Sequence, residues 1–270
     1  MSTTIEPTPT LAIVNARVWT GDAKRPWAEA VLVTGDRITT VGSSAEVRKS
    51  ARPLTRVIDA NGMMVTPGFI DSHVHFMDGG FGLTSVQLRN AKTREEFISR
   101  IKAHAATMPA GAWMLEGDWD HQNWGGELPR KDWIDSVTPN TPVFIQRLDG
   151  HMSLANTAAL KAAGVTRDTK DVAGGEIVRD ASGEPTGIFK DNATSIVDHA
   201  IPDPLPAQED AALAAAMKYV AEQGVTSVHN MGSWSDLAAF QRAEKAGKLR
   251  TRIYAAVPLA TWERLRDTVA

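Results

Sequence analysis

The chain has 270 residues, of which 43% are hydrophobic and 23% are charged, and its formal net charge is -3. These values are typical of a globular protein with a sizeable core, and they give no indication of nucleic-acid binding. The sequence contains no cysteine, which excludes disulfides and thiolate ligands. Any metal must therefore be held by histidine and carboxylate side chains.

The N-terminal sequence predicts no targeting segment. Residues 1–10 (MSTTIEPTPT) have neither a basic nor an apolar stretch, so we expect a loose tail without a secretory signal. No apolar run approaches the roughly 18 residues of a membrane span. We therefore expect no membrane association and a cytoplasmic location.

Residues 11–67 form a region of short predicted strands. Apolar or alternating runs separated by turn-forming sequences occupy residues 11–19, 30–33, 37–41 and 56–59. This pattern predicts a small N-terminal β-sandwich portion over residues 11–67, followed by a second domain over residues 68–270.

The most informative segment is PGFIDSHVHF, residues 67–76. Its apolar start predicts a strand, and successive side chains of a strand point to opposite faces. His73 and His75 therefore project to the same side. Two imidazoles at the end of one strand form half of a metal site, which suits zinc or another divalent first-row ion.

Beyond residue 68, predicted strands alternate with amphipathic helices. Helices are expected over residues 93–108 and 208–223, and the second ends at Gly224 before a strand over residues 225–228. A helix, a glycine and a buried strand in this order predict an α/β fold with a parallel sheet or a barrel.

The stretch between residues 77 and 205 is less regular. Strands are predicted over residues 113–115 and 142–146, and a hairpin over residues 176–180 and 185–189. Four tryptophans occur close together in it: Trp113, Trp119, Trp124 and Trp133. They either fill a core, or one or two of them line a substrate pocket.

These motifs resemble the amidohydrolase superfamily, and within it the YtcJ-like branch (amidohydrolase family 3). The segment VTPGFIDSHVH at residues 65–75 carries the resemblance to the superfamily. The branch is indicated by Trp119-Asp120 followed by Trp124, by the run from Pro142 to His151, by GEPTG at residues 183–187 with Asp191, and by GVTSVH at residues 224–229. The resemblance covers residues 11–260.

The resemblance implies a (β/α)8 metallo-hydrolase barrel with a small β-sandwich, whose catalytic residues lie at the C-terminal ends of the strands. It implies a metal-dependent hydrolase of C–N bonds in an amide-type small molecule, either an amide or a cyclic amide. A divalent metal, most often zinc, would activate a water that attacks the carbonyl. Homo-oligomers are common in the superfamily, and the sequence sets no subunit number.

The resemblance also assigns roles to single residues. His73 and His75 would be metal ligands, and His151 would act as an acid–base group, or else as a structural loop histidine. Asp191 would reach the metal site, or else cap the helix that follows it. Lys190, as a carboxylated bridging ligand, is a weaker alternative to Asp191.

The remaining candidates lie around these residues. His229 ends a strand and would bind substrate, or only line the wall of the active-site mouth. Trp119 and Asp120 are assigned to substrate binding as well. Asp71 would orient the histidine pair by hydrogen bonding. Three other histidines are assigned to the surface or to packing: His104, His121 and His199.

The count of strands predicts an incomplete barrel. Residues 69–75, 225–229 and 252–257 would be its first three strands, with residues 77–205 as a large insertion after the first. A complete barrel takes roughly 250 residues, so we expect a C-terminally truncated enzyme whose later metal ligands are absent. The alternative is a non-catalytic fragment or degenerate paralogue that lacks the rest of the metal site.

Overall fold

A computed structural model describes residues 8–269, and the boundary between its two compact units lies between Phe69 and Ile70. The tail expected over residues 1–10 lies outside the described part up to residue 7. Thr10 donates its backbone N–H to the carbonyl oxygen of Val33 at 2.8 Å, and Pro9 accepts a hydrogen bond from the Thr55 hydroxyl at 3.0 Å. The prediction of a loose tail is therefore wrong for residues 9 and 10, which belong to the first unit.

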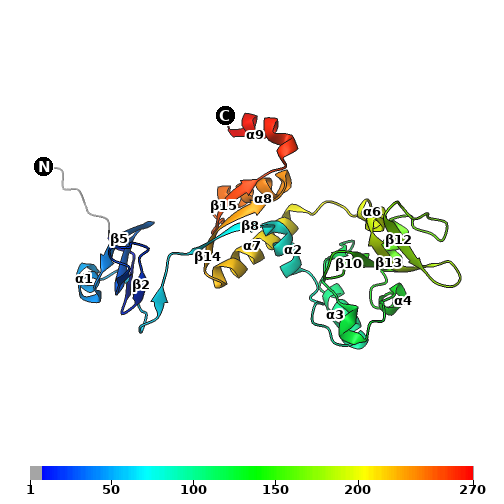
Figure 1. The fold of residues 1–270 in the computed structure, drawn as a ribbon, viewed down its shortest axis with the longest axis horizontal. Coiled ribbons are helices and arrows are strands. Elements are labelled where there is room, and N and C mark those ends of the chain that lie inside the picture. Colours follow the sequence, from blue (N-terminus) through cyan, green and yellow to red (C-terminus); the bar gives the residue numbers. More distant parts are fainter. Residues whose placement is uncertain (1–7, 270) are drawn as a thin grey trace. The chain divides into compact units, whose positions relative to one another are not determined.

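The first unit contains two small sheets and one helix (Figure 1). The four-stranded sheet has the order β5 (Arg37–Gly42), β4 (Ala30–Thr34), β1 (Leu11–Val14) and β6 (Arg56–Asp59). The three-stranded sheet has the order β3 (Trp27–Ala28), β2 (Arg17–Trp19) and β7 (Met64–Val65). Helix α1 spans Ser44–Ser50.

Alternation along the strands gives the four-stranded sheet two apolar faces. Val14 and Leu32 belong to a buried cluster with Val47 of α1. Val31 belongs to a second cluster with Val18 of β2, between the two sheets. The strand predicted over residues 11–19 is interrupted at Asn15, whose φ of 53° turns the chain from one sheet into the other.

The second unit contains a three-stranded sheet with the order β15 (Arg252–Ala256), β14 (Val225–Met231) and β8 (Phe69–Val74). Strands β14 and β15 are parallel, with His229 opposite Tyr254. Four helices accompany these strands: α2 (Phe76–Thr84), α7 (Pro206–Glu222), α8 (Trp234–Lys245) and α9 (Trp262–Val269). Parallel strands connected through helices make the fold α/β, as predicted.

One face of this sheet packs on helices. Val74, Val228 and Ile253 contact a buried cluster formed by side chains of α2, α7 and α8. Since neighbouring residues of a strand point to opposite faces, His73, His229 and Tyr254 lie on the other face. The strands β14 and β15 thus separate an apolar side from a side that carries imidazole and phenol rings.

Helix α7 begins and ends where its sequence requires. Pro206 occupies its first turn, where the missing N–H is not needed. It ends at Glu222, and Gly224 follows with a φ of 78°, as expected for a residue after a helix. Met217 and Leu213, one turn apart, point from α7 into the cluster shared with α2 and α8.

The rest of the second unit is built on a five-stranded sheet. Its order is β12 (Gly175–Arg179), β13 (Pro185–Asp191), β11 (Met152–Ala155), β10 (Val143–Gln146) and β9 (Met114–Leu115). The predicted hairpin is confirmed, because β12 and β13 pair antiparallel. The helical segments are α3 (Arg94–Ala105), η1 (His121–Trp124), α4 (Lys131–Ile134), α5 (Thr157–Ala162), η2 (Asn192–Thr194) and α6 (Ser195–Asp198), and η3 (Leu259–Thr261) precedes α9.

The five-stranded sheet also has two buried faces. Ile145 and Leu154 belong to a cluster with Trp119 and Trp133. Their neighbours Phe144 and Ala155 belong to a cluster on the opposite face. Within residues 8–269, no helix combines the length and apolarity that crossing a membrane would take.

The substitution Leu213→Ala tests the packing of α7. Leu213 is 1% exposed, so its truncation leaves a cavity and is expected to lower the free energy of unfolding by about 2–5 kcal/mol. Urea denaturation followed by circular dichroism measures this loss. The matched control is Leu259→Ala, where the leucine is 85% exposed and the expected change is within about 0.5 kcal/mol. Equal losses for the two variants would contradict the described packing.

Candidate functional site

The histidine pair lies where β8 passes into α2. Strand β8 ends at Val74, and His75 is the residue immediately before the helix. Both histidines are exposed, their ring centroids are 5.8 Å apart, and the ring planes are inclined by 76°. Two imidazoles at this separation with solvent access can offer one nitrogen each to the same ion.

Asp71 acts on the backbone of β8. Its Oδ1 accepts a hydrogen bond from the backbone N–H of His73 at 3.1 Å. The expectation that Asp71 orients the pair by hydrogen bonding therefore applies to the main chain before the first histidine, since this bond goes to the main-chain N–H and not to a ring nitrogen. His75 has a different acidic neighbour, because its Nδ1 lies 3.8 Å from Oδ2 of Asp78 in the first turn of α2.

A cavity of about 470 Å³ adjoins His75 at the ends of the strands. Its walls come from the starts of α2 and α8, from the last residues of β14 and β15, and from the residues that follow these strands. The lining residues are His75, Asp78, Met231, Gly232, Ser233, Asp236, Ala256, Val257 and Pro258. Burial raises the pKa of Asp78, the negative charge of Asp236 raises it further, and His75 acts in the opposite direction.

The donor set around the pair fits part of a metal site. In the described part of the chain, no group of three or more histidine and carboxylate side chains is arranged to hold an ion. His73 and His75 supply two nitrogen ligands of the type that zinc prefers. They would hold an ion together with donors from elsewhere, and their role as metal ligands stays a prediction.

A second polar pair is formed by His151, the residue before β11, and Asp191, the last residue of β13. The Nδ1 of His151 lies 2.9 Å from Oδ1 of Asp191, and their side chains are 73% and 55% exposed. The Asp191 side chain makes no capping bond to η2, so the alternative of a helix cap is not realised. Lys190 is engaged elsewhere, since its Nζ lies 2.9 Å from Glu176.

The backbone of Asp191 is strained. Its φ of 48° and ψ of -128° lie in a region that residues with a Cβ rarely occupy. Such a conformation costs on the order of 1–3 kcal/mol and is retained where the surrounding structure enforces it. The strain accompanies the side-chain contact with His151, and so marks this position for functional tests.

Arg147 organises the polar residues near Trp119. Its guanidinium lies 3.1 Å from the carboxylate of Asp120, forms an ion pair with Asp149, and donates to Nδ1 of His121 at 3.2 Å. Burial lowers the pKa of His121, and the positive charge of Arg147 lowers it further, whereas Asp120 and Asp149 oppose this. Asp120 is therefore held in an ion pair with Arg147, and its contact with substrate stays a prediction.

Trp119 and His229 differ in their access to solvent. Trp119 is 0% exposed and donates its indole N–H to the carbonyl oxygen of Ile145 at 2.8 Å, so its ring fills the core. The contact of Trp119 with substrate stays a prediction, and the buried position of the ring does not favour it. The ring of His229 lies 5.1 Å from that of Tyr254, which is 68% exposed on the same face of the sheet.

Several polar residues of this region were not identified from the sequence. Glu116, Gly117 and Asp118 have φ values of 62°, 113° and 51°, so the loop before Trp119 is left-handed over three residues. Burial raises the pKa of Glu116, and the charges of Asp118 and Asp78 raise it further. The only sequence signal was a glycine between two acidic residues, which indicates a turn but not its burial.

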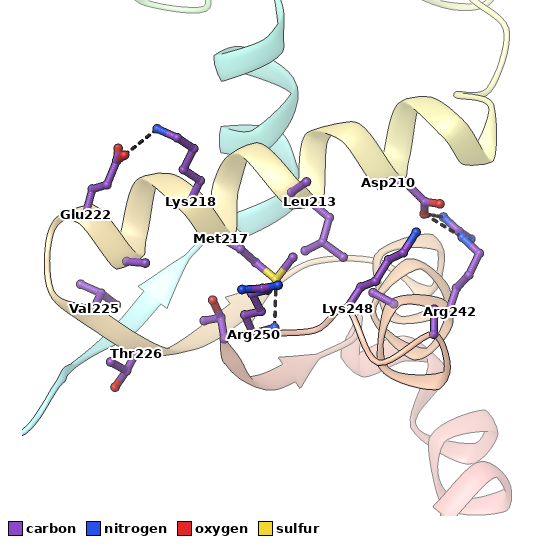
Figure 2. A pocket seen from close by; sticks show the side chains of 15 residues that line it. Asp210, Leu213, Met217, Lys218, Glu222, Val225, Thr226, Arg242, Lys248 and Arg250 are labelled. Atoms are coloured by element: carbon purple, nitrogen blue, oxygen red, sulfur yellow. Dashed lines mark hydrogen bonds and ion pairs between the residues drawn. The ribbon is translucent and has the colours of Figure 1, made fainter. Parts of the chain in front are cut away.

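A larger cavity, of about 770 Å³, lies between α7 and α8 near the starts of β14 and β15 (Figure 2). Figure 2 shows Met217 and Leu213 projecting from α7 into it. Its charged residues are largely paired, with Lys218 2.5 Å from Glu222 and Arg242 2.8 Å from Asp210. No histidine lines this cavity, so the cavity beside His75 is the better candidate for hydrolytic chemistry.

The substitution Glu116→Gln tests the half-buried carboxyl group of Glu116. A raised pKa means that the folded protein holds this proton more tightly than the unfolded chain. The free energy of unfolding should therefore fall as the pH rises from the ordinary value of 4.5 through the raised pKa. Glu116→Gln removes this loss, so the variant should gain stability over the wild type as the pH is raised from 4 to 7.

Urea titrations at both pH values measure this difference. Exposed Glu244 provides the control, since Glu244→Gln should change stability by no more than about 0.5 kcal/mol at either pH. A Glu116→Gln variant whose difference from the wild type does not change with pH would show that Glu116 is not buried as described.

Comparisons with known proteins find relatives that match most of this chain. The protein LONG AFTER FAR-RED 3 of Arabidopsis thaliana is 37% identical over 268 residues, which cover 95% of this chain and 46% of that protein. An N-substituted formamide deformylase of Arthrobacter pascens is 39% identical over 191 residues, covering 69% and 35%. The YtcJ protein of Bacillus subtilis (strain 168) is 32% identical over 250 residues, covering 88% and 47%.

The fold is shared with a solved structure. The crystal structure of an uncharacterized metal-dependent hydrolase from Pyrococcus furiosus matches with a TM-score of 0.73 and 23% identity, covering 96% of this chain and 52% of that one. The chain thus spans about half the length, or less, of these relatives. The family model for the amidohydrolase family matches residues 56–270. The resemblance found in the sequence is therefore confirmed, and the chain belongs to the amidohydrolase family, in its YtcJ-like branch (amidohydrolase family 3).

Proposed function

We propose that the intact protein is a metal-dependent hydrolase of C–N bonds in amides or cyclic amides. The observation that carries the proposal is the exposed pair of imidazoles, 5.8 Å apart at the end of β8, beside a cavity at the strand ends. His73 and His75 would hold a divalent ion, and zinc is the first candidate. When bound, such an ion supplies a Lewis acid that polarises a carbonyl and lowers the pKa of water.

The proposed architecture is a (β/α)8 barrel. Strands β8, β14 and β15 would be its first three strands, residues 77–205 an insertion after the first, and the first unit a β-sandwich. The parallel pairing of β14 with β15 and the helices α8 and α9 that follow them support this arrangement. In such barrels the catalytic groups lie at the C-terminal ends of the strands, which is where His75 lies.

His151 and Asp191 are proposed as the acid–base pair. When the Nδ1–H of His151 donates a hydrogen bond to Asp191, Nε2 is unprotonated, so it can take a proton from the attacking water and then pass that proton to the leaving amine. The exposure of both side chains supports this role, because a proton-transferring group must reach its substrate. His229, Asp120 and Trp119 are proposed to contact the substrate.

The substrate class is proposed from the same family. One relative is named for an N-substituted formamide, which is a small amide with one acyl carbon. We therefore place small amide-type molecules first among the substrates. The cytoplasmic location, homo-oligomeric assembly and absence of nucleic-acid and membrane partners stay predictions.

The experiment is a hydrolysis screen of the intact, zinc-loaded protein. N-substituted formamides, N-acyl amino acids and cyclic amides are supplied, and release of the amine is measured. His73→Ala should reduce turnover by about three orders of magnitude, because a Lewis acid contributes several kcal/mol to the transition state. The control is exposed His199→Ala, which should retain activity.

Two results would contradict the proposal. One is unchanged turnover in His73→Ala. The other is the absence of hydrolysis of every amide by a wild-type protein that is folded and loaded with zinc, which the alternative of a non-catalytic fragment or paralogue predicts.

The strain at Asp191 gives a separate prediction. Glycine adopts the observed φ of 48° without a Cβ penalty. The Asp191→Gly variant should therefore be more stable than the Asp191→Ala variant, with a free energy of unfolding higher by about 1 kcal/mol or more. Neither variant should support turnover if Asp191 is part of the acid–base pair. At Gln241, in the middle of α8, glycine should instead be less stable than alanine by about 1 kcal/mol. Urea denaturation measures these stabilities. If the glycine variant were the more stable one at both positions, or the alanine variant at both, the described backbone at these positions would be contradicted.

A further inference from the structure

A buried amide binds the backbone of the residue that follows His75. Asn230 is 0% exposed in strand β14. Its Oδ1 accepts a hydrogen bond from the backbone N–H of Phe76 at 2.8 Å, across 154 positions of sequence. Phe76 follows His75 directly, so this bond holds the peptide group through which β8 passes into α2.

The hydrogen bond from Phe76 to Asn230 satisfies a backbone N–H that has no partner within α2. The first N–H groups of a helix have no partner within it, and a side chain at the preceding residue often accepts one of them. His75 occupies that preceding position and makes no capping bond. Asn230 supplies the acceptor from another strand, so the imidazole of His75 has no capping role at the start of α2.

The other end of the Asn230 side chain is fixed by α8. Its Nδ2 donates to Oδ2 of Asp236 at 3.1 Å, and Oδ1 of Asp236 accepts from the Ser233 hydroxyl at 2.8 Å. A Cβ on Gly232 would lie 2.0 Å from Asp236 Oδ2 and 2.3 Å from Asn230 Nδ2. Glycine at position 232 is therefore required for this close contact.

We propose that Asn230, oriented by Asp236, is a positioning residue that fixes His75 toward His73 for metal binding. The inference rests on the proposed function, in which these two histidines hold the ion. Asn230 touches neither ring and acts through the main chain of Phe76. It also lies opposite Ala255 in the register of β14 and β15, so its own side chain is on the face that packs on the helices.

The test combines two measurements on the full chain. Zinc affinity is measured by competition with a chromophoric chelator, and the imidazole signals of His73 and His75 are recorded by NMR without metal. Loss of a group that orients a metal ligand typically lowers metal affinity 10- to 100-fold. Asn230→Ala should show a loss of about this size and a shifted or broadened His75 signal, with that of His73 kept.

A swapped pair distinguishes positioning from general destabilisation. Asn230→Asp alone keeps the acceptor for Phe76 but opposes the carboxylate of Asp236, so it should lose affinity. Adding Asp236→Asn restores a donor at that contact and should recover most of the affinity and the His75 signal. Leu213→Ala loosens the same helix core but removes no hydrogen bond of Asn230, so it should leave affinity within about twofold.

The outcomes separate the two proposals. If the wild type binds no zinc but Asn230→Ala still shifts the His75 signal, the positioning role stands and the proposed metal site falls. If Asn230→Ala keeps both the zinc affinity and the His75 signal, the positioning role is wrong. The positioning role is also wrong if Leu213→Ala loses as much zinc affinity as Asn230→Ala. It is wrong as well if the swapped pair recovers neither the zinc affinity nor the His75 signal.

Discussion

The two-residue periodicity of three neighbouring strands is the constraint on which the rest of this structure depends. Val74, Val228 and Ile253 point to the helices, and their packing fixes which way every neighbour must point. The imidazoles of His73 and His229 consequently lie on the side away from the helices. A shift of one residue in any strand would bury these polar rings and expose the apolar side chains, so burial of the core also sets the orientation of the candidate site.

The polar residues of the site fall into two groups with different physical roles. The histidines and the His151–Asp191 pair are exposed and can meet a ligand. Asn230 and Asn156 are each 0% exposed, and both offer Oδ1 to a backbone N–H that begins a helix or strand. Buried amides tolerate such positions only when their hydrogen bonds are satisfied. Asn230 holds the start of α2 next to His75, and Asn156 holds the start of β10.

Much of the fold could be predicted from local sequence pattern. The end of α7 at Gly224, the antiparallel hairpin and the paired histidines each depend on residues within a few positions of one another. Asn15 was missed because a left-handed asparagine inside an apolar run leaves no local signal. At the start of α3, Thr93 accepts a hydrogen bond from the N–H of Glu96, and the Glu96 carboxylate accepts one from the N–H of Lys92.

The support of the site could not be predicted in the same way. The hydrogen bond between Asn230 and Phe76 joins residues 154 positions apart in the sequence. The periodicity of apolar residues along the chain cannot predict a contact at that sequence separation. The burial of Trp119 and the raised pKa of Glu116 depend likewise on which segments the fold brings together. Residue types and spacing identified the candidate ligands, whereas the groups that hold them in place were visible only in three dimensions.

The central claim is that His73 and His75 converge as one chelating pair. Electron paramagnetic resonance of the chain with one equivalent of copper(II)–iminodiacetate tests it directly, because the spectrum counts coordinated imidazole nitrogens. The account predicts two equivalent nitrogens in the wild type and a single nitrogen in both His73→Ala and His75→Ala. A wild-type spectrum with one nitrogen, unchanged in the two variants, would contradict it.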